Sequence, residues 1–160
     1  MNFNVIGAFA ALALLAACTH TAPAVAPSTG GSGSAQTAPG PVPGSQEDLV
    51  ATAGDRVFFL LNESTLSDEA QGTLDKEAAW LAKYPSVSVQ VAGNCDDRGT
   101  TEYNMALGNR RAKASRDFLV AKGVASSRIT TISYGKERPT ALGDDDQAWS
   151  QNRNTITTVK

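Results

Sequence analysis

Residues 87–122, VSVQVAGNCDDRGTTEYNMALGNRRAKASRDFLVAK, join a strand pattern to a long helix pattern through a polar loop. Over residues 87–92 valine alternates with smaller or polar side chains, which is typical of a half-buried strand. Residues 93–101 form the loop. Residues 102–122 form the helix, which ends before Gly123 because glycine commonly follows the last helical residue. This segment predicts a helix that packs against a sheet.

The residues before this segment predict one more strand and one more helix. The apolar run at residues 57–61, VFFLL, indicates a buried strand. Ser67 can cap the helix that follows, and Pro85 marks its end. The apolar stripe of this helix consists of Ala70, Leu74, Ala78 and Leu81.

After the long helix, residues 129–134 and 154–159 predict two further strands, with a short helix between them at residues 147–151. The order βαβαββ predicts an α/β fold, a two-layer sandwich with helices on one face of a mixed sheet. Residues 47–160 are enough to enclose one hydrophobic core, so they are expected to form a single folded domain.

The long helix carries an arginine on the face that should meet the core. With Leu107 at zero on the helical wheel, Arg111 falls at about 40°, inside the apolar stripe. The same stripe contains Tyr103, Ala114 and Phe118. A charged group at the edge of a core needs a partner, which Asp96 or Asp97 in the preceding loop can supply. Alternatively, Arg111 extends outward to water and both aspartates are solvated loop charges.

The first 46 residues have a different composition from the rest. All 14 basic and 16 acidic side chains lie at or after Glu47. Residues 5–17 form an apolar run that is short for a membrane span and typical of a secretory signal. The run ends in LAAC at residues 15–18, which resembles the lipobox of bacterial lipoproteins. Residues 1–17 are therefore expected to be a signal peptide, and Cys18 a lipid-bearing N-terminus. The alternative is an ordinary signal peptide followed by a coincidental cysteine.

Residues 19–45 consist almost entirely of Pro, Gly, Ser, Thr and Ala. Such a segment cannot bury enough apolar area to offset the entropy lost on ordering. Residues 18–46 are therefore expected to be the lipidated cysteine and a disordered tether. His20, the one histidine of the chain, lies in this tether and is not expected to be catalytic.

Several function classes are disfavoured by the same composition. The net charge of −2 gives no electrostatic reason to expect nucleic-acid binding. Cys95 has no histidine in the folded domain to activate it as a nucleophile. A metal site needs more His or Cys ligands, and residues 144–146 lack the alternating spacing of a calcium loop. The sequence therefore predicts a protein that is not an enzyme and that needs no metal or cofactor.

Five segments together resemble the OmpA-like peptidoglycan-binding domain family, and within it the peptidoglycan-associated lipoproteins. They are GNCDDRGT (93–100), EYN (102–104), LGNRRA (107–112), SYGKERP (133–139) and QNR (151–153). The resemblance extends over residues 55–160. There are two departures: Asn94-Cys95, where the family usually has His-Thr, and Leu61-Asn62, where it usually has Phe-Asp.

The resemblance implies a pocket for the meso-diaminopimelate side chain of peptidoglycan stem peptides. The far end of that side chain carries an ammonium and a carboxylate on one carbon. Asp96 matches the family's ammonium-binding acid, and Arg111 matches the arginine that binds the carboxylate with two parallel N–H groups. Asn62, Asn104 and Arg153 are further expected ligand residues.

The resemblance also implies partners and a location. The lipid is expected in the inner leaflet of the outer membrane, with the domain in the periplasm, bound to peptidoglycan. TolB and other Tol proteins are the expected protein partners, with a role in envelope integrity and cell division. The alternative is a lipoprotein whose main task is docking to TolB and that has lost wall binding.

Replacing the predicted lipid attachment site tests the anchor. Cys18→Ser should leave the domain folded but release it from membranes, because the tether contains no apolar stretch to hold it. Phase partition in detergent measures this. Equal recovery of the variant and the parent in the detergent phase would show that Cys18 is not the anchor.

Overall fold

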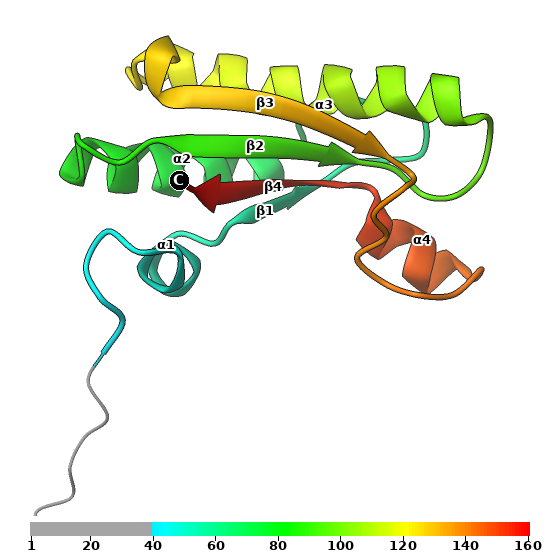
Figure 1. Cartoon of the computed structure of the whole chain (residues 1–160), viewed down its shortest axis with the longest axis horizontal. Coiled ribbons are helices and arrows are strands. Elements are labelled where there is room, and N and C mark those ends of the chain that lie inside the picture. Colours follow the sequence, from blue (N-terminus) through cyan, green and yellow to red (C-terminus); the bar gives the residue numbers. More distant parts are fainter. Residues whose placement is uncertain (1–39) are drawn as a thin grey trace, which may run out of the picture. The chain divides into compact units, whose positions relative to one another are not determined.

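Four strands form one mixed sheet in the order β1-β4-β2-β3 (Figure 1). The structure is a computed structural model that describes residues 40–160, so the predicted signal peptide, Cys18 and most of the predicted tether lie outside the described residues. The strands are β1 (Arg56–Phe58), β2 (Val89–Asn94), β3 (Ile129–Gly135) and β4 (Asn154–Val159). The helices are α1 (Gln46–Thr52), α2 (Asp68–Lys83), α3 (Thr101–Ala121) and α4 (Asp146–Asn152).

The sheet is mixed because β2 runs parallel to β3 and antiparallel to β4, which also pairs antiparallel with β1. The two long helices, α2 and α3, cover one face of the sheet (Figure 1). The predicted fold class, a two-layer α/β sandwich with strands and helices in the order βαβαββ, is confirmed, and the predicted short helix is α4. Among the helices of residues 40–160, none combines the length and the apolar character needed to cross a membrane.

β1 is shorter than predicted. The predicted strand covered residues 57–61, but regular pairing ends at Phe58, and Leu60 is 66% exposed. The chain leaves the sheet because the carbonyls of Phe59 and Leu60 accept hydrogen bonds from arginine side chains. β2 is displaced in the opposite sense, since it begins at residue 89 rather than 87 and continues to residue 94.

α1 was not predicted, and it begins at Gln46, the last residue of the predicted tether. Ser45 caps it by accepting a hydrogen bond from the backbone N–H of Asp48 at 3.2 Å. Leu49 is fully buried in the core, and the Gln46 side chain accepts from the backbone N–H of Val159 at 2.8 Å. A helix of two turns is too short to show a clear periodicity in the sequence. It is stable here because of these contacts with distant residues.

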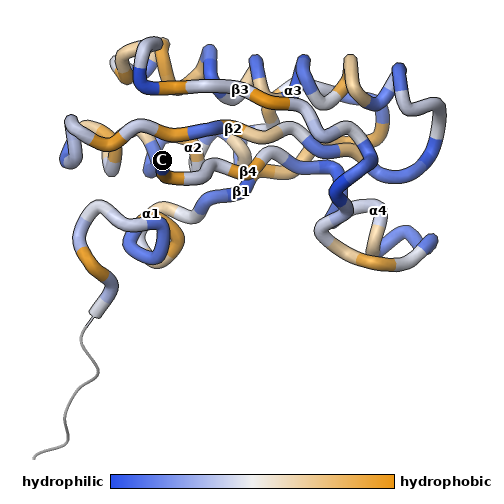
Figure 2. Tube along the Cα trace, viewed as in Figure 1, coloured by the Kyte–Doolittle hydropathy of each residue, from blue (hydrophilic) through white to orange (hydrophobic). Residues whose placement is uncertain are grey.

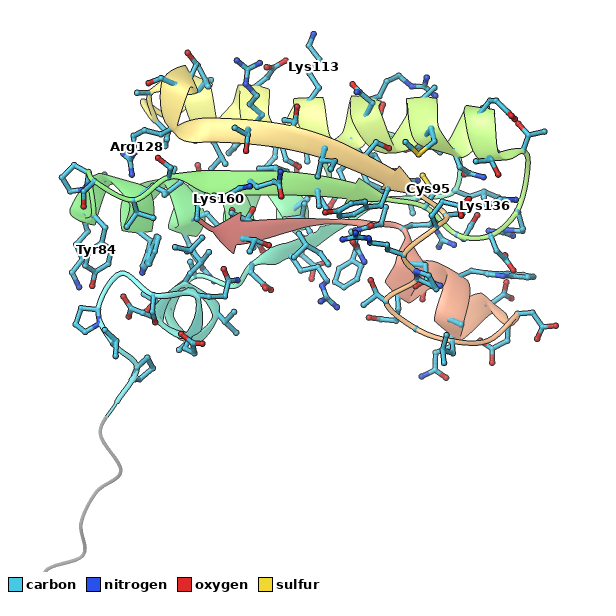
Figure 3. All side chains as sticks on the ribbon, viewed as in Figure 1. Tyr84, Cys95, Lys113, Arg128, Lys136 and Lys160 are labelled. Carbon is cyan, nitrogen blue, oxygen red and sulfur yellow. The ribbon has the colours of Figure 1, made fainter. Side chains whose placement is uncertain are left out.

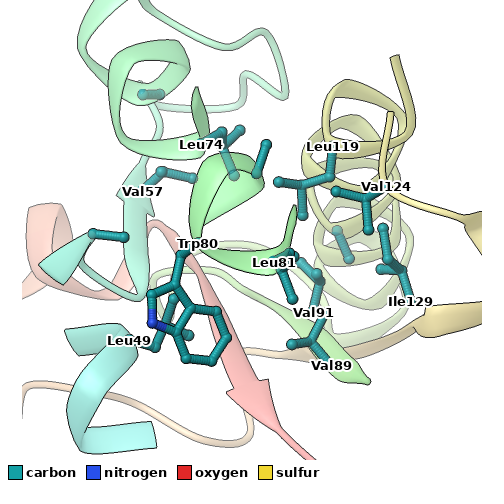
Figure 4. Packing of buried hydrophobic residues seen from close by; sticks show 14 of the residues in the cluster. Leu49, Val57, Leu74, Trp80, Leu81, Val89, Val91, Leu119, Val124 and Ile129 are labelled. Carbon is teal, nitrogen blue, oxygen red and sulfur yellow. The ribbon is translucent and has the colours of Figure 1, made fainter. Parts of the chain in front are cut away.

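The core lies between the sheet and the two long helices (Figure 4). The predicted stripe of α2 is buried as expected, and Ser67 caps the helix by accepting from the N–H of Ala70. Leu81 of α2, Val91 of β2 and Leu119 of α3 are completely enclosed. Polar residues lie instead at one end of the sheet, near the loop before α3 and α4 (Figure 2).

The backbone of α3 touches the backbone of β2 at a pair of glycines. A Cβ atom added to Gly93 would lie 1.9 Å from the carbonyl oxygen of Gly108, and one added to Gly108 would lie 2.8 Å from that of Gly93. Any larger residue at either position would therefore force the helix away from the sheet. The close approach fixes the depth and the rotation of α3.

The face that α3 turns to the sheet differs partly from the predicted stripe. Leu107 and Arg111 are buried as expected, but Tyr103 is 42% exposed, and Ala114 and Phe118 are only partly buried. Small and polar residues face the sheet instead: Asn104, Gly108 and Ser115. The hydroxyls of Ser115 and Thr155 are 2.9 Å apart. The helical wheel therefore predicted the wrong rotation of α3 about its axis. The contact between Gly93 and Gly108, and not the apolar content of the helix, sets that rotation.

Arg128 secures the end of the molecule opposite the polar loops (Figure 3). Its guanidinium donates to the carbonyl oxygens of Val87 at 2.7 Å, Tyr84 at 2.8 Å and Leu81 at 3.0 Å. The last carbonyls of a helix have no partner within the helix, so this side chain satisfies the end of α2 and its connection to β2.

Glu77 of α2 is fully buried against β4. Its Oε2 accepts a hydrogen bond from the Thr157 hydroxyl at 2.7 Å, whereas Oε1 has no partner among the described residues. Burial raises the pKa of the Glu77 carboxyl from 4.5 to about 7, a shift that the Thr157 hydrogen bond opposes and the nearby Asp55 reinforces. The folded protein therefore holds a proton that the unfolded chain releases at lower pH.

This proton makes stability depend on pH. The contribution of Glu77 is fully present below pH 4.5 and is lost as the pH rises through about 7. Glu77→Gln should therefore be more stable than the parent at pH 8, by up to about 3 kcal/mol, and differ little at pH 4. Urea unfolding across this range measures the difference. Glu69→Gln, an exposed change on the same helix, is the control, and a pH-independent effect of Glu77→Gln would contradict the assignment.

Candidate functional site

The predicted ligand residues meet at the end of the sheet where β1 and β2 end and β4 begins. Three segments converge there: the loop after β1, the loop between β2 and α3, and the chain between α4 and β4. Cys95 and Lys136 lie at this end of the molecule (Figure 3). The β strand pairing, and not proximity in sequence, brings these segments together.

Arg111 is the largest fully buried side chain of the described residues, with 0% exposure. Its Nε donates to Glu63 O at 2.8 Å and its Nη2 to Leu60 O at 3.0 Å. Its Nη1 donates to Asn94 O at 2.8 Å and to the sulfur of Cys95 at 3.5 Å. The alternative that Arg111 extends outward to water is therefore wrong. The predicted pairing with Asp96 or Asp97 is wrong too, because backbone carbonyls and the Cys95 sulfur are the partners of Arg111 among the described residues.

A guanidinium has five N–H groups, and these four contacts leave one N–H on Nη2. Arg111 therefore has one N–H for an incoming carboxylate, which has to displace part of the surrounding loop to reach it, because the side chain is fully buried. Two parallel bonds, as predicted from the sequence, use two different nitrogens, so Nε or Nη1 would also have to release a present acceptor. Burial lowers the pKa of the Arg111 guanidinium.

Asp96 is also buried, at 4% exposure, and lies between two other arginines. Its Oδ2 accepts from Arg98 at 2.5 Å and from Nη1 of Arg153 at 3.3 Å. Within residues 40–160 its Oδ1 has no hydrogen-bond partner. Asp97, by contrast, is exposed, so the two adjacent aspartates differ in environment.

Arg153 links Asp96 to the loop after β1. Its Nε donates to Phe59 O at 3.1 Å, while Nη1 contacts Asp96. The structure therefore brings together Asp96 and Arg153 directly. Arg111 joins them through the same loop, whose carbonyls it binds next to Phe59.

Asn62 and Asn104 occupy different positions from those expected of ligand residues. Asn62 is exposed and has a φ of 59°, which a turn of left-handed backbone requires. Its side-chain oxygen accepts from the Tyr103 hydroxyl at 3.2 Å. Asn104 is buried, and its amide donates to the carbonyls of Arg98 at 2.7 Å and Thr100 at 3.1 Å. Asn104 therefore holds the loop before α3.

Two contributors were not predicted from the sequence, Arg98 and Tyr103. Arg98 lies two residues after Asp96 in the loop before α3, and the two side chains form an ion pair. Tyr103 was assigned to the core stripe of the helix, although it binds Asn62 at the surface. The hydrogen bond with Asp96 raises the pKa of the Arg98 guanidinium.

The site has more positive than negative charge. Two guanidiniums, from Arg98 and Arg153, contact the buried Asp96 carboxylate, and a third, from Arg111, binds the same loop after β1. Such a site can bind a carboxylate, with Oδ1 of Asp96 available for a cation beside it. Within the described range no group of three or more His, Cys, Asp or Glu side chains is arranged to hold a metal ion.

An open groove with a volume of about 470 Å³ adjoins Arg153. Its lining includes Phe58, Leu60, Leu66 and Gln151. Phe58 and Leu60 are exposed, so apolar surface is available next to the charged site. The groove can accept a part of a ligand, or of a protein, that extends beyond the arginine cluster.

Cys95 packs against the Arg111 guanidinium. It is buried, its Sγ contacts Asn104 O at 3.4 Å, and it is the free cysteine of the described residues. Burial raises the pKa of the Cys95 thiol, while the neighbouring Arg111 lowers it.

This environment predicts an unreactive thiol. Cys95 should react with Ellman's reagent far more slowly in the native protein than in concentrated guanidinium chloride, because the thiolate is disfavoured and the sulfur is enclosed. Mass spectrometry of the mature monomer should show no disulfide. Rapid labelling of the native protein would contradict the buried position.

Comparison with known proteins identifies relatives of the chain. The OmpA family model matches residues 58–154. The chain is 52% identical over 117 residues to the peptidoglycan-associated lipoprotein of Rhizobium meliloti (strain 1021), covering 73% of this chain and 66% of that protein. It is 56% identical over 117 residues to the protein of the same name from Mesorhizobium japonicum, covering 73% and 70%. The match thus spans about two thirds of the length of these relatives.

Solved structures show the same fold. The crystal structure of the peptidoglycan-associated lipoprotein from Burkholderia pseudomallei superposes with a TM-score of 0.64 at 38% identity, covering 66% of this chain and 90% of that one. The C-terminal domain of Helicobacter pylori MotB gives 0.62 at 21% identity, covering 66% and 84%, which shows a shared fold alone. Because the family model covers more than half of the residues and the sheet and helices agree, this chain belongs to the OmpA family.

Proposed function

We propose that this protein is a non-enzymatic lipoprotein that binds peptidoglycan non-covalently through the diaminopimelate of its stem peptides. The observation that carries the proposal is the pair of buried, oppositely charged side chains, Asp96 and Arg111, at one end of the sheet. The high identity to proteins named peptidoglycan-associated lipoprotein supports it.

The chemistry of the site suits a zwitterion. The ligand ammonium would donate to Oδ1 of Asp96, which has no partner among the described residues. The ligand carboxylate would accept the remaining N–H of Arg111, and a second, parallel one when Nε or Nη1 releases a present acceptor. Charge-assisted hydrogen bonds of this kind are about twice as strong as neutral ones.

The anchor is part of the proposal. Residues 1–17 would direct export, Cys18 would carry the lipid in the outer membrane, and residues 18–46 would leave the domain free to reach the wall from the periplasmic side. Fully extended at about 3.3 Å per residue, the tether would reach on the order of 90 Å. Work with the Tol proteins in envelope integrity and cell division follows from the family resemblance.

A second candidate function is docking of a protein such as TolB as the main task. The groove of about 470 Å³ and its exposed Phe58 and Leu60 favour a protein contact next to the charged site. Binding of the purified protein to isolated sacculi separates the two functions, because a docking protein that has lost wall binding would stay in solution.

Truncating the ligand tests the site without altering the fold. A lysine-type stem peptide keeps the ammonium but lacks the carboxylate, so it should bind about 30-fold or more weakly than a diaminopimelate stem. Arg111→Ala should weaken binding of the diaminopimelate stem by a similar factor and change binding of the lysine stem little. Asp96→Asn should weaken both. Calorimetry with the two ligands and three proteins measures all six affinities.

Arg111 also holds the loop after β1, so circular dichroism must show that each variant is folded. Arg111→Lys is the conservative control, and it should recover little, because an ammonium cannot replace three backbone contacts and the carboxylate contact together. Equal losses for both ligands on Arg111→Ala would mean that Arg111 supports the fold alone.

A further inference from the structure

Asp96 is bound by two guanidiniums at the same oxygen. Arg98 donates to Oδ2 at 2.5 Å and Arg153 donates to it at 3.3 Å. The other oxygen, Oδ1, has no hydrogen bond to any described residue. The two arginines thus orient the carboxylate and leave one defined oxygen for a ligand.

Arg98 is itself held from two sides. Its Cζ lies 4.2 Å from the centre of the Trp149 ring, on α4, in a cation–π stack. Its backbone carbonyl accepts from the buried Asn104 amide at 2.7 Å. The side chain of Arg98 is 37% exposed. Contact with the Trp149 ring restricts the conformations that this partly exposed side chain can adopt.

The stack of Arg98 on Trp149 leaves two buried N–H donors without acceptors in the described part of the chain. Arg98 Nε and Trp149 Nε1 are both enclosed, and neither has an acceptor among the described residues. Unpaired buried donors are rare because each loses its hydrogen bonds to water. Exceptions of this kind concentrate where function constrains the side chains.

We propose that Arg98 and Trp149 are positioning residues for Asp96: Trp149 holds the Arg98 guanidinium by its face, and Arg98 with Arg153 holds Oδ2 so that Oδ1 accepts the ligand ammonium. This inference rests on the proposed function. Neither residue touches the ligand ammonium itself, and both act through the carboxylate.

A competing role for Arg98 has the opposite consequence. If Arg98 occupied the cation site as a substitute for the ligand, the ligand ammonium would have to displace it, and removing Arg98 would strengthen binding. The geometry favours positioning, because Arg98 shares Oδ2 with Arg153 and leaves Oδ1 open.

A double-mutant cycle on the full chain, in detergent micelles, tests the inference with a diaminopimelate muropeptide. Arg98→Ala should weaken binding about tenfold in the parent and less than about twofold in an Asp96→Asn background, because its effect passes through Asp96. Trp149→Ala should resemble Arg98→Ala. Trp149→Phe keeps a ring beneath the guanidinium and should retain most of the affinity.

A second experiment uses a muropeptide that lacks the ammonium group. Acetylating the free amine of the muropeptide removes the ammonium, and Arg98→Ala should then change binding less than about twofold. Thermal melts confirm that each variant is folded. Tighter binding on Arg98→Ala, or equal losses with and without Asp96, would overturn the positioning role and leave the proposed function intact. No binding by the parent, or no effect of Asp96→Asn, would overturn the proposed function and this inference with it.

Discussion

The contact between the backbones of Gly93 and Gly108 governs the arrangement of the candidate site. It lets α3 lie so close to β2 that a single Cβ atom at either glycine would collide with the opposite backbone. At this depth Arg111, one turn further along the helix, is enclosed. A buried guanidinium must find acceptors, and the nearest are the carbonyls of the loop after β1 and of the end of β2. The length of β1 and the shape of its loop follow from that requirement.

The charges at this end of the sheet depend on one another. Arg153 binds both the loop after β1 and Asp96, and Arg98 binds Asp96 under the ring of Trp149. A buried carboxylate with several guanidiniums is costly to assemble, because each charge loses its hydration. Such a cluster is a weak source of stability, which agrees with the proposed recognition of a charged ligand.

The chain enters the described domain at the end of the sheet opposite the candidate site. α1, where the chain enters the domain, contacts the end of β4 through Gln46, whereas the candidate site lies at the end where β4 begins (Figure 1). In the proposed anchor the lipid and the wall would therefore be connected through the length of the sheet. Leu49 in the core and the hydrogen bond that Trp80 Nε1 donates to Asp48 at 3.0 Å fasten α1 to α2.

The sequence by itself determined the strands and long helices, the buried stripe of α2, and the position of an arginine at residue 111 on the core side of its helix, because these depend on periodicity and on local capping. It left open whether that arginine is buried or extends to water. The family resemblance singled out Asp96 and Arg111 as a pair. Only the tertiary structure decided the rotation of α3, the early end of β1, the order of α1 and the roles of Arg98 and Asn104. The rotation of α3, the early end of β1 and the order of α1 depend on groups far apart in the chain: a glycine on a strand meeting one on a helix, or a guanidinium meeting carbonyls some fifty residues away. Local patterns carry no information on such contacts, since packing and hydrogen bonding between distant segments select one arrangement from several that the same pattern allows.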